Sequence, residues 1–311
     1  MTGRSRERPV FSPKLTVVIG AVDAVRAIRA CIDSVIQSCR GTETEIILVD
    51  ASSDGTADAA RANFPDVQVV AMPTDTLVPR LWSEGIRRAR GDKIALLTGH
   101  CEVGVHWATE LASAIDSGAA GAGGPLALAP DASRVDAAIY FTRYSAFLPS
   151  STIGVTRVRD IAGDNAMYNG DLLRRHMASF NDGFWEVEFH ETLRREGEYL
   201  VMAAAAPVVF GHASNLEVIS RHRFLHGRHF GAWRVMRRRS DAARLIIGGP
   251  FVPLVLFERI ARRVRKSSAY RKRFIASSPL VLRLTAQWSL GELLGAFDAL
   301  NSSREKNANR S

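Results

Sequence analysis

The chain has 311 residues, of which 46% are hydrophobic and 23% are charged, and its formal net charge is +9. These are ordinary values for a folded protein, so they exclude wholesale disorder, and the length suffices for one large or two small domains. The three cysteines are too few and too scattered for a disulfide framework, and they favour reduced thiols in the cytosol. Residues 1–14 are basic and polar without an apolar core, so we interpret them as a disordered tail and not as a secretory signal.

The positive charge is concentrated in residues 219–275. This segment holds 16 Arg and Lys residues against two acidic residues, Asp241 and Glu258. It therefore carries a net charge of +14, more than the +9 of the whole chain, and the remaining residues are mildly acidic. Such basic segments usually bind nucleic acid or an anionic membrane surface.

From residue 15 to residue 118, short apolar runs alternate with stretches whose apolar residues recur at helical spacing. The runs predict strands at residues 15–20, 45–50, 67–71 and 93–97. The stretches predict helices at residues 24–37, 57–63, 80–90 and 107–117. Asp54 or Thr56 is expected to cap the second helix. Strands and helices that alternate at this spacing predict a mostly parallel, Rossmann-like sheet with helices on both faces.

The pattern is less regular after residue 118. Three segments have no clear period: an Ala/Gly-rich stretch at residues 118–124, an aromatic stretch at residues 134–158, and residues 160–168, interpreted as a strand or loop. Residues 185–196 have the apolar spacing of a helix. The apolar run 199–210 ends just before His212.

The fourth predicted strand ends on the polar sequence Thr98-Gly99-His100-Cys101-Glu102. In open α/β sheets, ligands lie just beyond the carboxyl ends of the strands. The His, Cys and Glu side chains at this point are therefore candidates for metal or phosphate chemistry. A polar loop that contains a buried thiol is the alternative interpretation.

Two further blocks point to a family. Val49-Asp50-Ala51-Ser52-Ser53-Asp54-Gly55-Thr56 is one residue shorter than the motif V-D-x-x-S-x-D-G-T, and Pro79-Arg80-Leu81-Trp82-Ser83-Glu84-Gly85-Ile86 is similar to A-R-N-x-G-I. Over residues 15 to 230 the chain resembles the inverting family-2 glycosyltransferases of the GT-A fold. The resemblance implies that Asp50 binds the nucleotide base, and that the other donor-binding positions are Ala21, Ser52, Ser53 and Arg80. The end of the first strand, Gly20-Ala21-Val22-Asp23, matches the family poorly, and Trp82 and Ser83 replace its usual Arg and Asn.

The Thr98-Gly99-His100 sequence stands where this family has the Asp-x-Asp motif that grips a divalent metal. It resembles a subgroup with a Thr, His and Cys at this strand end and a Trp a few residues later, here Trp107. The resemblance implies a metal site of His100, Glu102 and His212. Oxygen ligands suit Mg²⁺ or Mn²⁺, and an imidazole shifts the preference toward Mn²⁺. Hydrogen-bonded structural histidines are the alternative.

The helix at residues 185–196 resembles the family's E-D-x-E-L…R-L…G block. By this resemblance Glu186 is the catalytic base, Glu188 is the second choice, and His190 assists Glu186 from the same helical face four residues later. The alternative is an acidic helix start favoured by the helix dipole. Asn165-Ala166-Met167-Tyr168 is similar to the family's G-x-N-x-x-[YFR] segment, which implies that Asn165, together with Trp185, borders the acceptor site. A turn asparagine is the alternative here.

The C-terminal third is basic and partly apolar. Residues 221–230 occupy the place of a basic, aromatic segment in membrane-associated relatives and offer cations for a leaving diphosphate. Residues 245–257 are uncharged but too short to span a bilayer, so they predict an interfacial, re-entrant or core segment. Residues 280–300, with Trp288, predict an amphipathic helix. Such a region suits an anionic leaflet, or it packs on the body or on a second subunit as a helical appendage.

We therefore expect a GT-A domain at residues 15–218, with a nucleotide-binding half at about 15–118 and an acceptor half at about 119–218. Residues 219–311 are expected to be a basic, amphipathic helical region that contacts a membrane surface or forms a homo-oligomer. The expected reaction moves a sugar from a nucleotide-sugar, with UDP as the expected nucleotide, to a hydroxyl of a glycan or lipid-linked acceptor. The expected location is the cytoplasmic face of a membrane.

Two other functions stay open. The missing Asp-x-Asp motif allows a non-catalytic, GT-A-like protein that binds a nucleotide-sugar. The basic segment allows a nucleic-acid-binding protein, although the sequence contains no nucleic-acid-binding motif and we expect no such partner.

Overall fold

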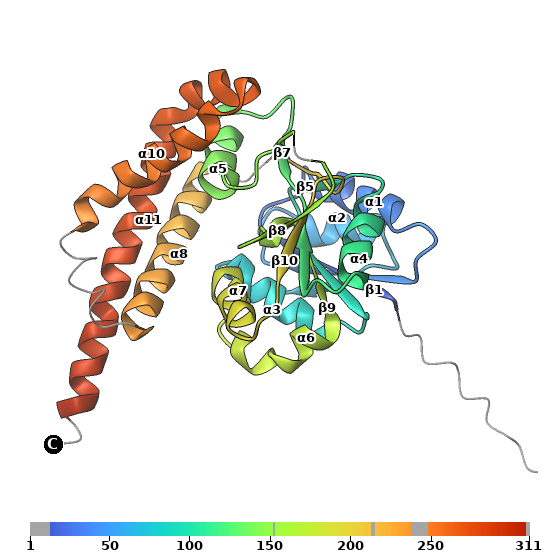
Figure 1. Cartoon of the computed structure of the whole chain (residues 1–311), viewed down its shortest axis with the longest axis horizontal. Coiled ribbons are helices and arrows are strands. Elements are labelled where there is room, and N and C mark those ends of the chain that lie inside the picture. The colour runs from blue at the N-terminus through green and yellow to red at the C-terminus, as the bar shows by residue number, and fades with distance from the viewer. Residues whose placement is uncertain (1–12, 152, 213–214, 238–247, 309–311) are drawn as a thin grey trace, which may run out of the picture. The chain divides into compact units, whose positions relative to one another are not determined.

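The computed structural model describes residues 13–151, 153–212, 215–237 and 248–308. The predicted tail lies outside the described residues up to residue 12. The chain divides into two compact units, one of residues 1–125 and 149–208 and the other of residues 126–148 and 209–311 (Figure 1). The expected acceptor half, about residues 119–218, is thus shared between the units, because residues 126–148 group with the C-terminal helices.

An eight-stranded sheet forms the centre of the first unit, in the order β3-β2-β1-β4-β9-β6-β10-β8. Its strands are β1 (Leu15–Ala21), β2 (Thr44–Asp50), β3 (Gln68–Ala71), β4 (Lys93–Thr98), β6 (Gly121–Gly123), β8 (Val155–Val158), β9 (Ala166–Asn169) and β10 (Leu200–Ala203). Strands β1 to β4 are parallel, as are β6 and β10, whereas β9 and β8 run antiparallel to their neighbours. The expected α/β class and its mostly parallel sheet are confirmed.

Helices cover the sheet of the first unit. They are α1 (Ile28–Ser38), α2 (Thr56–Asn63), α3 (Val78–Arg88), α4 (Trp107–Asp116), α6 (Gly170–Arg175) and α7 (Glu186–Arg195), with short 3₁₀ turns η1 (Gly163–Asn165) and η2 (Met177–Phe180) and the short strand β5 (Cys101–Val103). The predicted helices correspond to α1, α2, α3, α4 and α7, with ends that differ by a few residues. The interior residues of β1 and β4 are fully buried, as continuous apolar runs in parallel strands require.

The Ala/Gly-rich segment is part of the sheet interior. Gly121 in β6 lies beside Tyr168, and a Cβ added at Gly121 would be 2.7 Å from the Tyr168 ring. A Cβ added at Gly123 would be 2.7 Å from Ile161 Cβ. These positions therefore take glycine because the neighbouring side chains fill the space, and the segment is closely packed.

The second unit is mainly helical. It contains β7 (Leu126–Leu128), α5 (Arg134–Tyr144), the last two residues of β11 (Val208–Phe210), α8 (Leu216–Arg237), η3 (Gly249–Phe251), α10 (Val252–Arg265) and α11 (Ser268–Ala308). Helix α5 begins with a capping box between Ser133 and Asp136. Its side chains are buried on several sides, and Phe141 packs edge-to-face on Phe274 of α11, with ring centroids 5.3 Å apart. Because burial extends around α5, its sequence has no helical period, which explains why the helix was not predicted.

Helices α8 and α11 pack at very short range through glycine. A Cβ added at Gly227 or Gly231 of α8 would overlap a backbone carbonyl of α11. A Cβ added at Gly291 or Gly295 of α11 would likewise overlap a carbonyl of α8. The buried carboxylate of Glu292 receives Arg234 at 2.8 Å across the same contact. The two helices therefore form one closely packed pair (Figure 1).

Among the described residues, no helix has the length and apolar content needed to cross a membrane. The apolar segment 245–257 is described only from residue 248, and this part forms η3 and the first turns of α10.

Candidate active site

The carboxyl ends of three neighbouring strands lie level with one another. In the sheet register Ala21 of β1 is paired with Asp50 of β2, and Gly20 is paired with Thr98 of β4. The loops that follow these strands therefore leave the sheet at one edge. The Asp50 block and the His100 block, about 50 residues apart in the sequence, are brought together there, as was predicted for a ligand-binding edge.

Asp50 is held by the loops of this edge. Its Oδ1 accepts a hydrogen bond of 2.6 Å from Ser52 Oγ, which itself accepts the Asp23 backbone N–H at 2.8 Å. Asp23 has a left-handed backbone with φ of 49°, a conformation that Asp tolerates better than most residues. Its carboxylate accepts the Ser53 N–H at 3.1 Å and so fixes this conformation. Burial raises the pKa of Asp50, although the hydrogen bond from Ser52 opposes the shift.

The Asp54-Gly55-Thr56 turn connects the same two loops. Helix α2 begins after Gly55, which has φ of 89° and is the N-cap residue in place of the predicted Asp54 or Thr56. Asp54 Oδ1 accepts both the N–H and the hydroxyl of Thr56, at 3.1 and 2.5 Å. Its Oδ2 accepts the Val25 N–H at 3.0 Å. The acidic turn thus holds the loop after β1 against the loop after β2.

The polar residues after β4 have different surroundings. The His100 side chain is mostly buried, and its Nε2 lies 3.0 Å from the carbonyl oxygen of Val22. Cys101 is fully buried, whereas Glu102 is exposed. Thr98 Oγ1 donates a hydrogen bond of 2.7 Å to the buried carboxylate of Asp164. His100 and Thr98 thus both contact neighbouring loops at this edge of the sheet.

The predicted metal ligands are divided between the two units, with His100 and Glu102 in the first and His212 in the second. Within the described parts of the chain, no group of three or more His, Cys, Asp and Glu side chains is placed to hold a metal ion. His212 belongs to the second unit, where its Nε2 lies 3.8 Å from Asp131 Oδ2. The metal assignment of His100, Glu102 and His212 therefore stays a prediction.

In the block at residues 79–86, the two residues that depart from the resembled motif have structural roles. Trp82 is buried, and its indole Nε1 donates 2.8 Å to the Leu97 carbonyl. Ser83 is also buried, and its hydroxyl donates 2.7 Å to the Phe180 carbonyl. Arg80 is exposed on α3, with its guanidinium 3.9 Å from Asp182 Oδ1. Of these three residues, Arg80 alone presents its polar group to solvent.

A second polar cluster lies at the start of α7. Glu186 is the first residue of the helix and is half-buried, and His190 one turn later is fully buried. Nε2 of His190 lies 2.7 Å from the Tyr168 hydroxyl, and its Nδ1 lies 3.4 Å from Asp160 Oδ1. Asp160 is also 3.3 Å from the guanidinium of Arg194. The helix start is thus linked to β9 and to the segment before η1.

The charge states in this cluster follow from burial and from near neighbours. Burial lowers the pKa of His190, with Asp160 acting in the opposite direction. Burial acts to raise the pKa of Asp160, but His190 and Arg194 lower it below its usual value. Burial, followed by the negative charges of Glu186 and Asp160, raises the pKa of Tyr168 well above its usual value. At neutral pH the cluster therefore holds a charged Asp160, a neutral His190 and a protonated Tyr168.

Asn165 has a structural role. Its Oδ1 accepts 2.8 Å from Trp107 Nε1, and its Nδ2 donates 3.2 Å to the Pro125 carbonyl and 3.0 Å to the Ala206 carbonyl. The side chain is fully buried, and both amide protons are used within the protein. These contacts show that Asn165 stabilises the fold, and its predicted role beside the acceptor stays a prediction. Trp185, the N-cap of α7, is half-buried and its Nε1 donates 3.3 Å to the Asp182 carbonyl.

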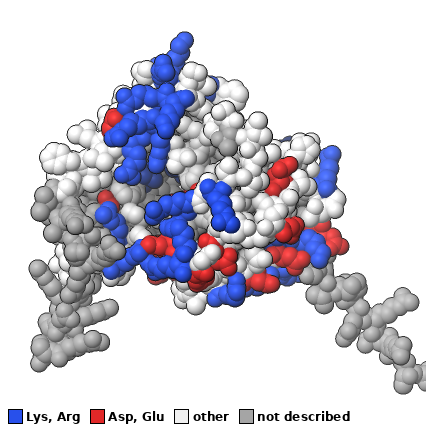
Figure 2. Space-filling model, viewed as in Figure 1, with Lys and Arg blue, Asp and Glu red and all other residues white. Residues whose placement is uncertain are grey.

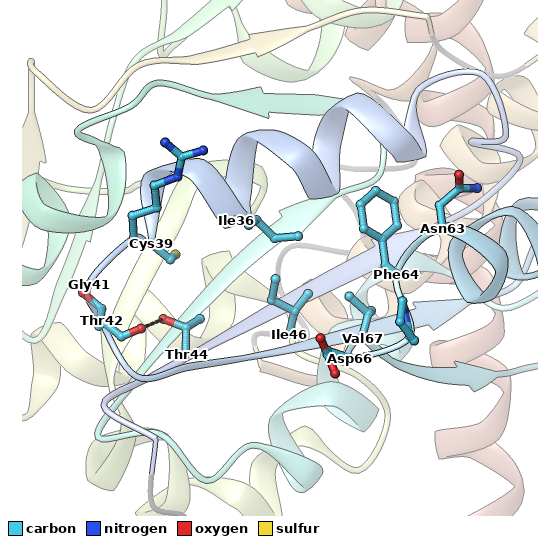
Figure 3. A pocket seen from close by; sticks show the side chains of 12 residues that line it. Ile36, Cys39, Gly41, Thr42, Thr44, Ile46, Asn63, Phe64, Asp66 and Val67 are labelled. Carbon is cyan, nitrogen blue, oxygen red and sulfur yellow. Dashed lines mark hydrogen bonds between the residues drawn. The ribbon is translucent and has the colours of Figure 1, made fainter.

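The first unit also has a pocket away from this edge. Its volume is about 550 Å³, and it lies between the ends of α1 and α2 and the starts of β2 and β3. Figure 3 shows Ile36, Ile46, Phe64 and Val67 facing this space. The strands of this half run away from the pocket, so it is at the amino edge of the sheet, opposite to Asp50. It is not part of the candidate active site.

The family follows from a comparison of the chain with models of known families. Residues 16–176, more than half of the chain, match the model of glycosyl transferase family 2. The chain belongs to glycosyl transferase family 2. Enzymes of this family are inverting glycosyltransferases, so the predicted enzyme class and GT-A-like fold are confirmed, and a nucleotide-sugar donor and an acceptor are implied. GT-A enzymes generally use a divalent cation. No curated protein matches the chain.

The matched range covers one of the two polar clusters fully. It includes the edge of the sheet that carries Asp50 and His100. It ends at residue 176, before Glu186 and His190. Asp160 and Tyr168 lie in the stretch 160–168, which the sequence analysis interprets as a strand or loop, and neither is among the predicted site residues. The signal that pointed to them was the unusual density of polar side chains in an otherwise apolar stretch, Asp160 to Tyr168.

Proposed function

We propose that this family-2 enzyme transfers a sugar from a UDP-sugar to an acceptor hydroxyl by a single inverting displacement. The observation that supports the donor assignment is the sheet register, in which β1 and β2 end level with one another and the buried Asp50 is the last residue of β2. Ligands of open α/β sheets bind beyond this end of the strands. A carboxylate there accepts an N–H of the nucleotide base. Ser52 orients Asp50, and Ser53 and Ala21 supply the backbone around it.

We infer that Glu186 is the general base. In the reaction the acceptor oxygen forms a bond to the anomeric carbon, and the acceptor proton passes to the Glu186 carboxylate. The bond from the anomeric carbon to the diphosphate oxygen breaks on the opposite face, and the nucleoside diphosphate keeps the electron pair. The half-buried position of Glu186 at a helix start, beside the buried Tyr168 and His190, suits a carboxylate that exchanges a proton. Glu188, two residues later, is also half-buried and is the alternative base.

The negative charge of the leaving diphosphate requires a cationic partner. Arg80 is the residue that we assign to this role, because it is exposed on α3 and its guanidinium has one carboxylate neighbour at 3.9 Å. His100, Glu102 and His212 remain the predicted metal ligands. An arginine offers several N–H donors in a fixed fork, which matches phosphate oxygens.

A second candidate function is nucleotide-sugar binding without transfer. It is favoured by the His100 side chain, which stands in place of a metal-binding aspartate and has a carbonyl neighbour at 3.0 Å. This candidate and the enzyme both require Asp50, but only the enzyme turns the donor over.

The acceptor that we propose for the enzyme is a hydroxyl of a glycan or of a lipid-linked sugar.

The test is a thermal-shift screen of the whole chain with nucleotides and nucleotide-sugars, each with Mn²⁺, with Mg²⁺ and with EDTA. A ligand that binds the folded state raises its melting temperature. The proposal predicts stabilisation by UDP and by at least one UDP-sugar, followed by slow release of UDP from that sugar. Stabilisation without any release of UDP supports the binding protein. No stabilisation by any nucleotide overturns both functions.

A further inference from the structure

Helix α11 exposes a long apolar stripe. Five large apolar side chains of this helix are between 37% and 65% exposed: Ile275, Leu282, Leu290, Leu294 and Phe297. Pro279 and Ala286 are also exposed and fall between them. The resulting steps of three and four residues place all seven on one face of the helix. With a rise of 1.5 Å per residue, the stripe is roughly 33 Å long.

The stripe is not the face of α11 that packs against the other helices of the second unit. The inward side carries the buried residues Val281, Leu284 and Ala296 and the glycines that contact α8. Trp288 is half-buried, with its ring 5.6 Å from that of Phe230 in α8. The core contacts of α11 are therefore made by its other faces. An exposed apolar strip of this length on a folded domain marks an interaction surface.

Cations accompany the stripe. Arg271 and Lys272 are exposed one turn before Ile275, and Arg283 is exposed next to Leu282. Helix α10 adds exposed Arg259, Arg262, Arg265 and Lys266 near its end, and exposed Phe251, Leu254 and Val255 near its start. Figure 2 shows Lys and Arg side chains gathered at the top of the view, where the turn between α10 and α11 lies in Figure 1.

The single acidic residue of α10 does not reverse this charge. Glu258 accepts hydrogen bonds from Arg262 and Arg265, each at 2.9 Å. The carboxylate is thus matched by two guanidinium groups, and the surface of α10 remains cationic. Apolar side chains beside an excess of Arg and Lys form the composition that binds the headgroup and acyl boundary of an anionic bilayer.

We propose that the exposed apolar stripe of α11, with the cations of α10 and α11, docks the protein on an anionic lipid bilayer. The apolar side chains enter the acyl boundary, and the Arg and Lys side chains contact headgroup phosphates. A second copy of this chain is a poorer partner for this face, because pairing two such faces would bring Arg and Lys side chains close to one another and they would repel. This inference rests on the residues of the second unit and not on the proposed reaction.

The test is co-sedimentation of the full chain with vesicles of phosphatidylcholine alone or with 30 mol% phosphatidylglycerol. We expect binding to the anionic vesicles only, with a marked loss as salt is raised. The double variants Leu290→Ser/Leu294→Ser and Arg271→Gln/Lys272→Gln should each lower the affinity at least about tenfold. Ile153→Ser is the matched control, because Ile153 is an exposed apolar residue of the first unit, and it should bind as the unchanged protein does.

Thermal melting of each variant distinguishes lost docking from lost folding. A stripe variant that melts like the unchanged protein and no longer sediments with vesicles supports the proposal. Absence of vesicle binding by the unchanged protein overturns it, as does binding that the stripe variants retain. A dimer in solution that dissociates in Leu290→Ser/Leu294→Ser, without vesicle binding, would assign the stripe to a second copy and overturn the lipid surface. None of these results depends on sugar transfer.

Discussion

The Tyr168 hydroxyl lies 2.7 Å from Nε2 of His190 in the interior of the first unit. Both side chains are fully buried, and Nδ1 of His190 faces Asp160 at 3.4 Å. Glu186 is one helical turn before His190, on the same side of α7. The start of α7 is therefore fixed by a polar contact with β9, and the proposed base has a defined position.

His190 should make stability depend on pH. Because burial lowers its pKa, the unfolded chain binds a proton at a pH where the folded chain does not. The free energy of unfolding should then be highest above pH about 6.5 and fall as the pH decreases below it. Urea denaturation of the unchanged protein and of His190→Gln at several pH values measures this. The variant should be less stable at pH 8 and should lose less stability than the unchanged protein between pH 7 and pH 5.5, because His226, whose pKa burial also lowers, remains in both proteins. An equal slope in both proteins would contradict this assignment. Asp160 contributes to the free energy of unfolding over a different pH range. Because its pKa is lowered in the folded state, this contribution is lost only as the pH falls below about 4.

Removing the Tyr168 hydroxyl should destabilise the protein. Tyr168→Phe keeps the ring contacts with Phe184 and Phe189 but leaves Nε2 of the buried His190 without this hydrogen bond. A buried polar atom that loses its partner costs about 1–3 kcal/mol in the free energy of unfolding. Tyr199→Phe is the matched control, because the Tyr199 hydroxyl makes a long contact of 3.4 Å at the surface. Equal stability of the two variants would show that the buried hydrogen bond contributes little.

Asp50→Asn should weaken nucleotide binding. The substitution keeps the size of the side chain and removes the charge that accepts the base N–H. We expect UDP to bind about tenfold more weakly by calorimetry, equivalent to about 1.4 kcal/mol. Asp58→Asn, at an exposed position on α2, is the control and should bind UDP normally. Unchanged UDP affinity in Asp50→Asn would place the nucleotide elsewhere.

The glycine contact between α8 and α11 should be sensitive to a single methyl group. Gly231→Ala would place a Cβ against the Glu292 carbonyl of α11, so the helices would have to separate. Overpacking of this kind costs about 1–3 kcal/mol. Gly248→Ala is the control, since a Cβ at Gly248 meets nothing within 4 Å. Thermal unfolding compares them, and a Gly231→Ala protein as stable as Gly248→Ala would contradict the close packing.

The strands and helices around Asp50 were predictable from the sequence. Buried parallel strands are continuous apolar runs, and the helices between them show a clear period. The alternation of these elements also predicts that Asp50 and His100 belong to segments at the same edge of the sheet. Helix α5 was not predictable, because burial on several sides removes the period. The contact of Gly231 with α11 was not predictable either, since it depends on which two helices pack together.

Individual roles were harder to predict than elements. Asn165 has the residue type and position of an acceptor-binding residue, but its amide is used by Trp107, Pro125 and Ala206, which are distant in the sequence. Asp160 and His190 are 30 residues apart, and no local pattern links them. A side chain's hydrogen-bond partners are set by tertiary packing, so sequence alone could name candidates but not show which groups remain available to a ligand.

Glu186 is the residue that we propose removes the acceptor proton. The most direct measurement compares UDP release and UDP affinity in Glu186→Gln and Glu188→Gln, using the UDP-sugar that stabilises the unchanged protein. A general base contributes about 10²–10⁴ in rate, so Glu186→Gln should lose at least about a hundredfold in turnover and bind UDP as before. Glu188→Gln should stay within a few-fold of the unchanged enzyme. Full turnover by Glu186→Gln, or loss of turnover in Glu188→Gln alone, would contradict the assignment.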